Sequence, residues 1–421
     1  MRNTTVVILG AGQAGLAMSS CLRNRSVDHV LLERGSSANS WRTERWDSLR
    51  LLTPNWLSRL PGWSYKGDDP DGYMTAAQVV EYLTDYRKVI EAPVHENTTV
   101  LSVKSGSTGF VTHTSNGPWR SRAVVVATGA CSQPRIPTVA QQLPNHINQI
   151  APIHYRGPTQ TPDGAVLVVG ASASGAQIAD ELARSGRSVT IAVGEHVRLP
   201  RTYRGRDIHW WMDLLGQLNE SYTEMADISR ARRLPSLQLI GSPTKRDLDV
   251  NALTAAGVAV VGRFVGIAAG RAQLSGSLAN ICASADLKQD RFLDQIDEFV
   301  SNGGMATFQA IASSQGVTAA LTDPIRPEPT VIRSHPTHLN LSSISTVIWA
   351  TGFRPTYPWL CADLLDRKGA IIHDGGVMQQ PGMYVLGLPF TRRRKSSFLD
   401  GVGPDAIDLT NHLANFLGSR I

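Results

Sequence analysis

Two glycine-rich turns stand out among the residues whose types and spacing could do chemistry. The first reads Gly10-Ala11-Gly12-Gln13-Ala14-Gly15, and the second reads Gly170-Ala171-Ser172-Ala173-Ser174-Gly175. Each follows a short apolar run and opens a segment with the pattern of a helix. Such turns bind nucleotide phosphates, because the helix N-terminus offers unpaired N–H groups and the positive end of its dipole. A chain with two of them is expected to hold two nucleotides and to pass electrons between them.

The first turn has the stronger pattern. Gly10 permits a tight turn, Gly12 lets the backbone approach a pyrophosphate, and Gly15 lets the helix pack closely on its strand. A second expected strand, residues 29–32, ends at Glu33, at about the 20-residue distance of the acid that binds ribose hydroxyls. Because Glu33 would repel a 2′-phosphate, we predict that this site binds FAD or NAD rather than NADP.

The second turn departs from the pattern at its centre. Ser172 replaces the middle glycine, although its hydroxyl can donate a hydrogen bond to a phosphate. No acid directly ends the following strand, residues 188–193, because Gly194 comes next. The chain then becomes rich in arginine, at Arg198, Arg201, Arg204 and Arg206. Guanidinium groups match phosphates in a bidentate manner, so this run favours NADPH over NADH; the alternative is an ordinary solvated surface.

The elements that position these turns predict an α/β protein with two dinucleotide-binding, Rossmann-like domains. Strands are expected at residues 6–9, 29–32, 123–127, 166–169, 188–193, 258–261, 346–350 and 383–386. Helices are expected at residues 75–88, 176–185 and 290–300, and in a terminal segment for which Gly403 and Pro404 supply the cap and first turn. The NADPH domain is expected to be inserted into the FAD domain. The predicted limits are 1–150 for the first part of the FAD domain, 163–320 for the NAD(P)H domain and 321–421 for the second part of the FAD domain.

Composition narrows the class of protein. The chain has 421 residues, 42% of them hydrophobic and 18% charged, with a net charge of +6, which is typical of a globular protein and gives no reason to expect nucleic-acid binding. The first expected strand begins close to Met1 and no apolar run is long enough for a membrane span, so we expect neither a signal peptide nor a span. The four cysteines lie far apart, which favours a reducing cytoplasm and argues against a zinc site or a redox-active thiol pair: Cys21, Cys131, Cys282 and Cys361.

Several of these features stand in one order along the chain. They are the two glycine turns, Trp41-Arg42, Ala127-Thr128-Gly129 and Ala350-Thr351-Gly352-Phe353-Arg354-Pro355. In this set and order the chain resembles the flavin-containing monooxygenase family over nearly its whole length, in particular bacterial members related to plant YUCCA enzymes. The resemblance implies that the first turn holds FAD, that the second holds NADPH, and that the alanine-threonine-glycine segments link the domains near the flavin.

The motifs and the resemblance together give a set of expected cofactor-binding residues. Those expected along FAD are Gly10, Gly12, Gln13, Ala14, Gly15, Glu33, Arg34, Trp41, Arg42, Ala127, Thr128 and Gly129. Those expected along NADPH are Gly170, Ser172, Ala173, Ser174, Gly175, Arg198, Arg201 and Arg204. Gly352, Gly387 and Asp405 complete the set; Asp405 could cap the terminal helix near the flavin, or act there for stability alone. We predict no metal site and assign no catalytic residue.

The resemblance implies a monooxygenase that inserts one oxygen atom from O₂ into a small organic substrate through a C4a-(hydro)peroxyflavin. The oxygenated atom would be a nitrogen, a sulfur or a carbonyl carbon. The chain departs from the family pattern at Leu52, Ala151 and Gly194, where members carry asparagine, histidine and arginine. The first two favour an alternative, an NAD(P)H-dependent flavin oxidase or reductase that does not stabilise the peroxyflavin. A flavin-binding module without activity is a further alternative, and a homodimer is left open.

Overall fold

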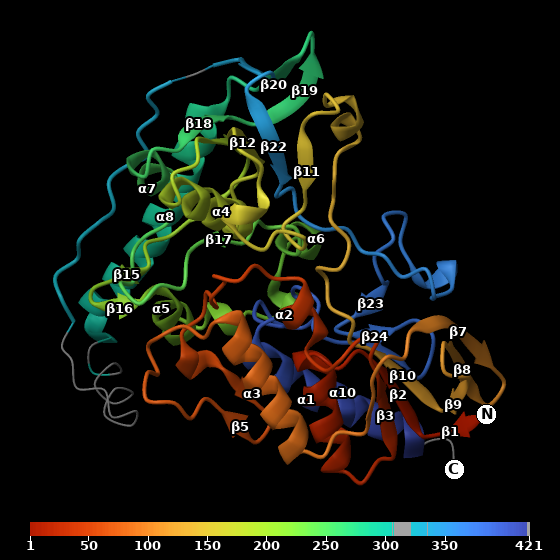
Figure 1. The fold of residues 1–421 in the computed structure, drawn as a ribbon. Coiled ribbons are helices and arrows are strands. Elements are labelled where there is room, and N and C mark those ends of the chain that lie inside the picture. The colour runs from red at the N-terminus through yellow and green to blue at the C-terminus, as the bar shows by residue number, and fades with distance from the viewer. Residues whose placement is uncertain (305, 307–320, 335, 419–421) are drawn as a thin grey trace.

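Two mainly parallel sheets, each covered by helices, organise the molecule (Figure 1). The structure, a computed structural model, describes residues 1–304, 306, 321–334 and 336–418. In the orientation of Figure 1 the first sheet lies below with helices α1, α3 and α10, and the second lies above with helices α4, α7 and α8. The two sheets therefore form separate lobes of one chain.

The first sheet has seven strands. Their order is β23 (His373–Asp374), β24 (Val377–Met378), β25 (Met383–Val385), β10 (Ala123–Val126), β2 (Val6–Leu9), β3 (His29–Leu32) and β6 (Val94–His95). The strands from β25 to β6 pair in parallel. Because successive side chains of a strand point to opposite faces, β2 places Val6 and Ile8 in one core and Val7 and Leu9 in the other.

Both faces of this sheet are covered. One carries α1 (Gln13–Arg23), α3 (Ala76–Val89) and α10 (Leu399–Gly418). The other carries an antiparallel excursion of β7 (Val100–Gly106), β8 (Gly109–Thr114) and β9 (Trp119–Ser121), to which β1 (Arg2–Asn3) adds in parallel. Thr75 caps α3 in a reciprocal arrangement with Gln78, which fixes the start of that helix.

The second sheet is parallel throughout. Its order is β11 (Asn148–Ile150), β22 (Ile344–Trp349), β12 (Ala165–Val169), β13 (Val189–Val193) and β18 (Ala259–Gly262). One face packs against α4 (Ala173–Arg184), α7 (Val250–Ala255) and α8 (Leu278–Phe299). The other faces the sheet of β19 (Phe264–Ala268), β20 (Arg271–Leu274) and β21 (His338–Asn340).

Shorter elements complete the two lobes. The strand pairs are β4 (Arg59–Leu60) with β5 (Trp63–Ser64), β14 (Val197–Arg198) with β17 (Leu237–Gln238), and β15 (Thr202–Tyr203) with β16 (Arg206–Asp207). The short helices are α2 (Asn39–Thr43), α5 (Ile208–Leu214) and α6 (Ile228–Ala231). None of the helices described has the length and apolar character that crossing a membrane requires.

The predicted fold class, two Rossmann-like units in one chain, is confirmed. Three strands lie elsewhere than expected, although the prediction placed residues 1–150 and 321–421 with the flavin domain. β11 and β22 pair in the second sheet, and β21 pairs with β20 in the sheet that covers it. Figure 1 shows β22 as a blue strand among the yellow and green ones. By strand pairing the chain returns to the first sheet only after Trp349, because β23 is its next member there. Residues 307–320, just before the expected boundary, lie outside the described part, and the domain limits themselves stay a prediction.

The terminal helix also begins earlier than predicted. α10 starts at Leu399, so Gly403 and Pro404 lie inside it rather than at its cap. The N–H groups of Gly401 and Val402 both bond to the carbonyl of Phe398, which forms a first turn ahead of the proline. Pro404 is tolerated because it lies near the start of the helix and forgoes only the bond to the carbonyl of Asp400.

Candidate nucleotide-binding sites

The first glycine turn lies at the carboxyl edge of the first sheet, between β2 and α1. Gly10 has φ +103°, and a Cβ on it would stand 2.6 Å from the carbonyl oxygen of Ala127. A Cβ on Gly15 would overlap the carbonyl oxygen of Gly10. Both glycines are therefore required by the packing of turn, helix and the segment after β10.

Gly12 has a different reason to be glycine. It is the N-cap residue of α1 and makes no side-chain capping bond, so the helix N-terminus is not closed by the protein. A Cβ at this position would meet no atom within 4 Å. The packing of the protein therefore does not require glycine here. A phosphate that approaches the free N–H groups does, because it needs the space that a side chain would fill. This open cradle fits the pyrophosphate of a dinucleotide.

Glu33 lies next to the turn at the end of β3. Its Oε2 accepts a hydrogen bond from the N–H of Ala11 at 2.9 Å, and its Oε1 accepts one from the N–H of Gly35 at 3.1 Å. The residue is buried. Each carboxylate oxygen has a second lone pair, so Glu33 can hold the turn and still accept a ribose hydroxyl.

The other residues expected along FAD surround this turn to different degrees. The indole N–H of Trp41 donates to Oε1 of Gln13 at 3.3 Å, and Nε2 of Gln13 donates to the carbonyl of Ser397 at 3.3 Å, just before α10. Arg42 donates to the carbonyl of Ser37 and to the hydroxyl of Thr84. These contacts bring Gln13, Trp41 and the start of α10 together at the turn. Arg34, by contrast, pairs with Glu44 and has a half-exposed side chain.

The segment after β10 and the turn after β25 complete this edge. Ala127 is buried beneath Gly10, Thr128 is exposed, and Gly129 has φ +73° with open space around it. A Cβ on Gly387 would stand 2.6 Å from Cβ of Ala14, so glycine is needed there for the loop to pass the first turn of α1.

The second turn repeats the first in its backbone. Gly170 has φ +108°, and its missing Cβ would overlap the carbonyl oxygen of Ala350, while a Cβ on Gly175 would overlap that of Gly170. Gly352, two residues beyond Ala350, has φ +86° with open space around it. The two alanine-threonine-glycine segments therefore stand in equivalent places beneath the two turns.

Ser172 takes the place of Gly12 and leaves the helix equally open. It is the N-cap residue of α4, and its hydroxyl makes no capping bond. Ala173 is buried in the first turn of α4, and Ser174 is partly exposed beside it. The carbonyl of Ala171 accepts a 2.6 Å bond from Nε2 of Gln238, a fully buried side chain that the sequence pattern did not single out.

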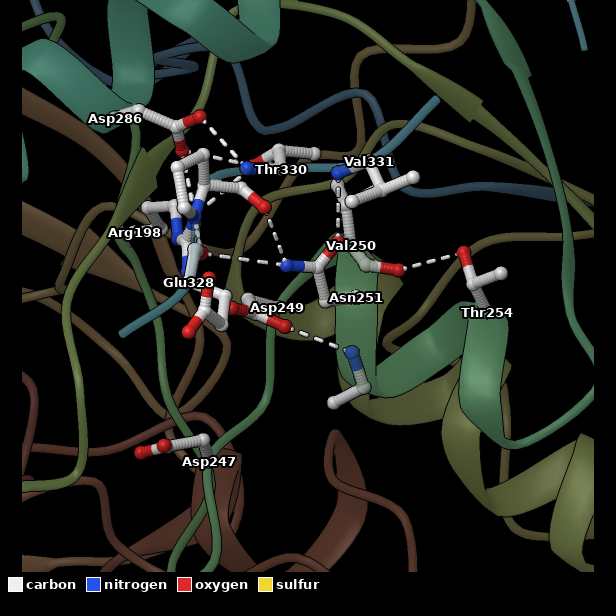
Figure 2. Close-up of polar contacts among 12 residues, drawn as sticks. Arg198, Asp247, Asp249, Val250, Asn251, Thr254, Asp286, Glu328, Thr330 and Val331 are labelled. Atoms are coloured by element: carbon white, nitrogen blue, oxygen red, sulfur yellow. Dashed lines mark hydrogen bonds and ion pairs between the residues drawn. The ribbon is translucent and has the colours of Figure 1, made fainter. Parts of the chain in front are cut away.

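The two terminal nitrogens of Arg198 are taken up by acceptors of the fold (Figure 2). It is 1% exposed and pairs with Asp286 at 2.5 Å and Asp249 at 2.7 Å. It also donates to the hydroxyl of Thr330 at 2.9 Å and to the carbonyl of Glu328 at 3.2 Å. Figure 2 shows these acceptors gathered around its guanidinium. Arg198 thus fastens residues 328–330 to α7 and α8.

Arg201 is committed to the junction between the lobes. It is fully buried, pairs with Asp207 at 2.8 Å and donates to the carbonyl of Leu52 at 2.9 Å. The hydroxyl of Tyr73 donates to the other oxygen of Asp207 at 2.6 Å. Burial alone would raise the pKa of Asp207, but the hydrogen bonds of His209 and Tyr73 and the charge of Arg201 lower it to about 2. Burial also lowers the pKa of His209, so its ring is neutral at pH 7.

Arg204 likewise has a carboxylate partner, Asp297, at 2.7 Å. With Arg198, Arg201 and Arg204 all paired, the prediction that this run binds a 2′-phosphate gains no support from the positions of their donors. The acids that pair with Arg198 and Arg204 lie 51 to 93 residues away in the chain, so no local pattern could have revealed them. Asp207 lies only six residues after Arg201.

Asp405 lies in the second turn of α10 and not at its start. It is fully buried and pairs with Arg393 at 2.6 Å, and burial raises its pKa. The acid in the first turn is Asp400, which pairs with Lys395. The basic run 392–395 is thus compensated by nearby acids, namely Asp400, Asp405, Asp408 and Glu220.

Comparison with known proteins identifies the family to which this chain belongs. A family model described as pyridine nucleotide-disulphide oxidoreductase matches residues 7–209. A CzcO-like oxidoreductase of Geobacillus kaustophilus is 31% identical over 97% of this chain and 98% of that protein. The chain belongs to the CzcO-like oxidoreductases of the flavin monooxygenase family. The chain is also similar to the indole-3-pyruvate monooxygenase YUCCA6 of Arabidopsis thaliana, with 32% identity over 48% of this chain and 51% of that protein.

A solved structure shares the fold of this family member over its whole length. The flavin-containing monooxygenase of Stenotrophomonas maltophilia superposes with a TM-score of 0.64 at 21% identity, covering 99% of this chain and all of that one. The family model and the curated relatives make the protein a flavin-dependent oxidoreductase that uses FAD and NAD(P)H. Both open glycine cradles fit these dinucleotides. Among the residues described, no cluster of His, Cys, Asp or Glu side chains is arranged to hold a metal.

Proposed function

We propose that this protein is an FAD- and NADPH-dependent monooxygenase that inserts one oxygen atom from O₂ into a small organic substrate. The observation that carries the proposal is the pair of matched glycine turns, each resting on its own alanine-threonine-glycine segment and each opening an uncapped helix. We assign FAD to the first turn, because Glu33 beside it would repel a 2′-phosphate, and NADPH to the second. When bound, FAD supplies two-electron chemistry with the nicotinamide and with O₂.

The residues of this chain would bind and orient the two dinucleotides. Gly12 and the N-terminus of α1 receive one pyrophosphate, and Ser172 and the N-terminus of α4 receive the other. The Arg201–Asp207–Tyr73 contacts join the two lobes and so help to orient the two sites toward each other. The substrate class, N- or S-oxygenation or Baeyer-Villiger oxidation, and the C4a-(hydro)peroxyflavin route stay predictions.

The two buried cysteines, Cys21 and Cys282, are unsuited to disulfide exchange, the chemistry that the description of the matching family model mentions. Burial raises the pKa of Cys21 and of Cys282 to about 11, so both thiols stay protonated and are poor nucleophiles. None of the described cysteines is in a disulfide. A reducing, cytoplasmic location is consistent with free thiols and stays a prediction.

The second candidate is an NAD(P)H-dependent flavin oxidase or reductase that releases peroxide. It is favoured by Leu52, which stands where family members carry an asparagine and here offers only its carbonyl, to Arg201. Both candidates are tested together on purified protein by recording the visible spectrum and following reduction by NADPH and by NADH without oxygen. Reoxidation with O₂ is then followed while peroxide is quantified. The proposal expects a yellow protein, bleached by NADPH, that with a suitable amine, sulfide or ketone forms oxygenated product. Peroxide equal to the NADPH consumed with every such substrate would favour the second candidate.

A further inference from the structure

The carboxyl edge of the second sheet holds an arginine outside the predicted run. β13 and β18 pair in parallel, with Val193 opposite Gly262. The next residues along the two strands are Gly194 and Arg263, so they leave the sheet side by side. A Cβ on Gly194 would stand 3.6 Å from Cδ and 3.8 Å from Cγ of Arg263. The side chain of Arg263 therefore lies against the space that a side chain at position 194 would enter.

The charges around this point leave Arg263 uncompensated. Its side chain is exposed, and within the described part of the chain its guanidinium has neither an ion pair nor a hydrogen bond. The acid nearest in sequence to the strand end, Glu195, pairs with Lys288 at 3.4 Å. His196 is buried, and burial lowers its pKa, so it adds no charge at pH 7. Among the described residues, Arg263 is thus an unpaired positive group at this strand end.

The position of Gly194 has a defined meaning in this fold. In a dinucleotide-binding sheet the adenine-side ribose lies at the end of the strand after the first crossover helix, which here is β13 following α4. An acid at that end favours the 2′-hydroxyl of NAD, and a nearby arginine accommodates the 2′-phosphate of NADP. Gly194 supplies neither group.

We propose that Arg263, reaching over Gly194 from the neighbouring strand, binds the 2′-phosphate of NADPH and sets the preference for NADPH over NADH. The assignment rests on the proposed function, in which the second turn binds NADPH. The planar guanidinium can form two parallel hydrogen bonds to a phosphate, and without a side chain at Gly194 nothing on that residue shields the arginine from the ligand.

The experiment uses two nucleotide fragments and requires no turnover. Adenosine 2′,5′-bisphosphate and 5′-AMP are titrated by calorimetry into the FAD-loaded wild type, Arg263→Ala, Arg263→Lys and Arg271→Ala. Arg271, also exposed and in the same lobe, controls for the loss of one positive charge. We expect the wild type to bind the bisphosphate about 10- to 100-fold more tightly than 5′-AMP, as for hydrogen bonds to a charged group. Arg263→Ala should lose this preference while keeping its 5′-AMP affinity, Arg263→Lys should keep part of it, and Arg271→Ala should match the wild type.

The possible failures are distinguishable. If the wild type does not prefer the bisphosphate, the choice of NADPH in the proposed function is wrong, and the role of Arg263 falls with it. If the wild type prefers it and Arg263→Ala keeps that preference, the proposed function stands and the assignment of Arg263 is wrong. Steady-state kinetics give an independent check. In Arg263→Ala, kcat/KM for NADPH should fall by the factor by which the variant loses affinity for the bisphosphate, and kcat/KM for NADH should stay within about twofold of the wild-type value.

Discussion

The first and second glycine turns are supported by the same backbone contacts and surrounded by different side chains. In both, the first glycine lies on the carbonyl of an alanine, Ala127 or Ala350, and the last glycine lies on the carbonyl of the first. Around the first turn a buried carboxylate, Glu33, accepts the N–H of Ala11. Around the second, a buried amide, Gln238, donates to the carbonyl of Ala171.

This difference separates where a dinucleotide binds from which dinucleotide binds. The shared backbone contacts create an open helix N-terminus and so locate a pyrophosphate in either lobe. In our proposal, the side chains that distinguish FAD from NADPH come from strand ends outside the glycine motif: Glu33 after β3 in one lobe and Arg263 after β18 in the other. Arg198, Arg201 and Arg204, which the sequence favoured as phosphate ligands, pair with acids of the fold instead.

The largest expected effect comes from removing the ion pairs of Arg198. Arg198→Met should lower the free energy of unfolding by about 3–5 kcal/mol, because it leaves Asp249 and Asp286 without their buried partner. Urea denaturation measures this. The exposed Arg271→Met is the matched control and should leave stability unchanged. A variant of normal stability that has lost its preference for NADPH would show instead that Arg198 is a ligand residue.

The next test separates the two turns by their last glycines. Gly15→Ala and Gly175→Ala each drive a Cβ into a backbone carbonyl, so each should cost about 1–3 kcal/mol and disturb one site. We expect Gly15→Ala to purify with little flavin, and Gly175→Ala to stay yellow while its KM for NADPH rises at least tenfold. Absorbance of the purified protein and steady-state kinetics check the two outcomes.

The control for this pair is Gly266→Ala in the second lobe, where a Cβ would meet no atom within 4 Å and which should behave as the wild type. Loss of flavin in Gly175→Ala with normal flavin in Gly15→Ala would reverse our assignment of the two cofactors.

The sequence predicted the parts of this comparison that are local. The bounds of β2 and β3 match the predicted ones, because a buried parallel strand is a continuous apolar run that ends at a glycine turn or an acid. The start of α10 was wrong because Gly403 and Pro404 imitate a helix start, while the real first turn forms on the carbonyl of Phe398.

What the sequence could not predict depends on contacts between distant residues. The acids that pair with Arg198 lie 51 and 88 residues away in the chain. Residues 344–349 join the second sheet by pairing with β12, a strand about 180 residues earlier in the sequence. The contact between Gly194 and Arg263 arises only from the register of β13 with β18. A charge run in a sequence carries no information about whether its charges are already paired.

Acid titration tests whether Arg201 stabilises the folded protein through its ion pair with Asp207 instead of serving as a phosphate ligand. The pKa of Asp207 is held at about 2, below its ordinary value of 3.8, so its ionised form stabilises the native state fully above pH 4. That contribution, about 2 kcal/mol, is lost as the pH falls from about 4 to about 2. Stability measured by urea denaturation across this range should therefore fall less steeply in Asp207→Asn than in the wild type. Asp163→Asn, which changes a fully exposed carboxylate, should follow the wild-type slope; equal slopes for all three proteins would mean that Asp207 carries no special charge coupling.

The smallest expected effects come from exchanging the middle residues of the two turns. Gly12→Ala adds a methyl group where the protein has open space, so stability should change by less than about 1 kcal/mol. The same methyl group occupies the place of a pyrophosphate, so FAD should dissociate about tenfold more readily, as measured by flavin titration of the apoprotein. Ser172→Gly makes the opposite change and should alter KM for NADPH by no more than about threefold, because the backbone N–H groups of α4 remain and only one hydroxyl donor is lost. If Gly12→Ala bound FAD normally, the open space beside α1 would not be the phosphate cradle, and the equivalence drawn between the two turns would hold for their packing alone.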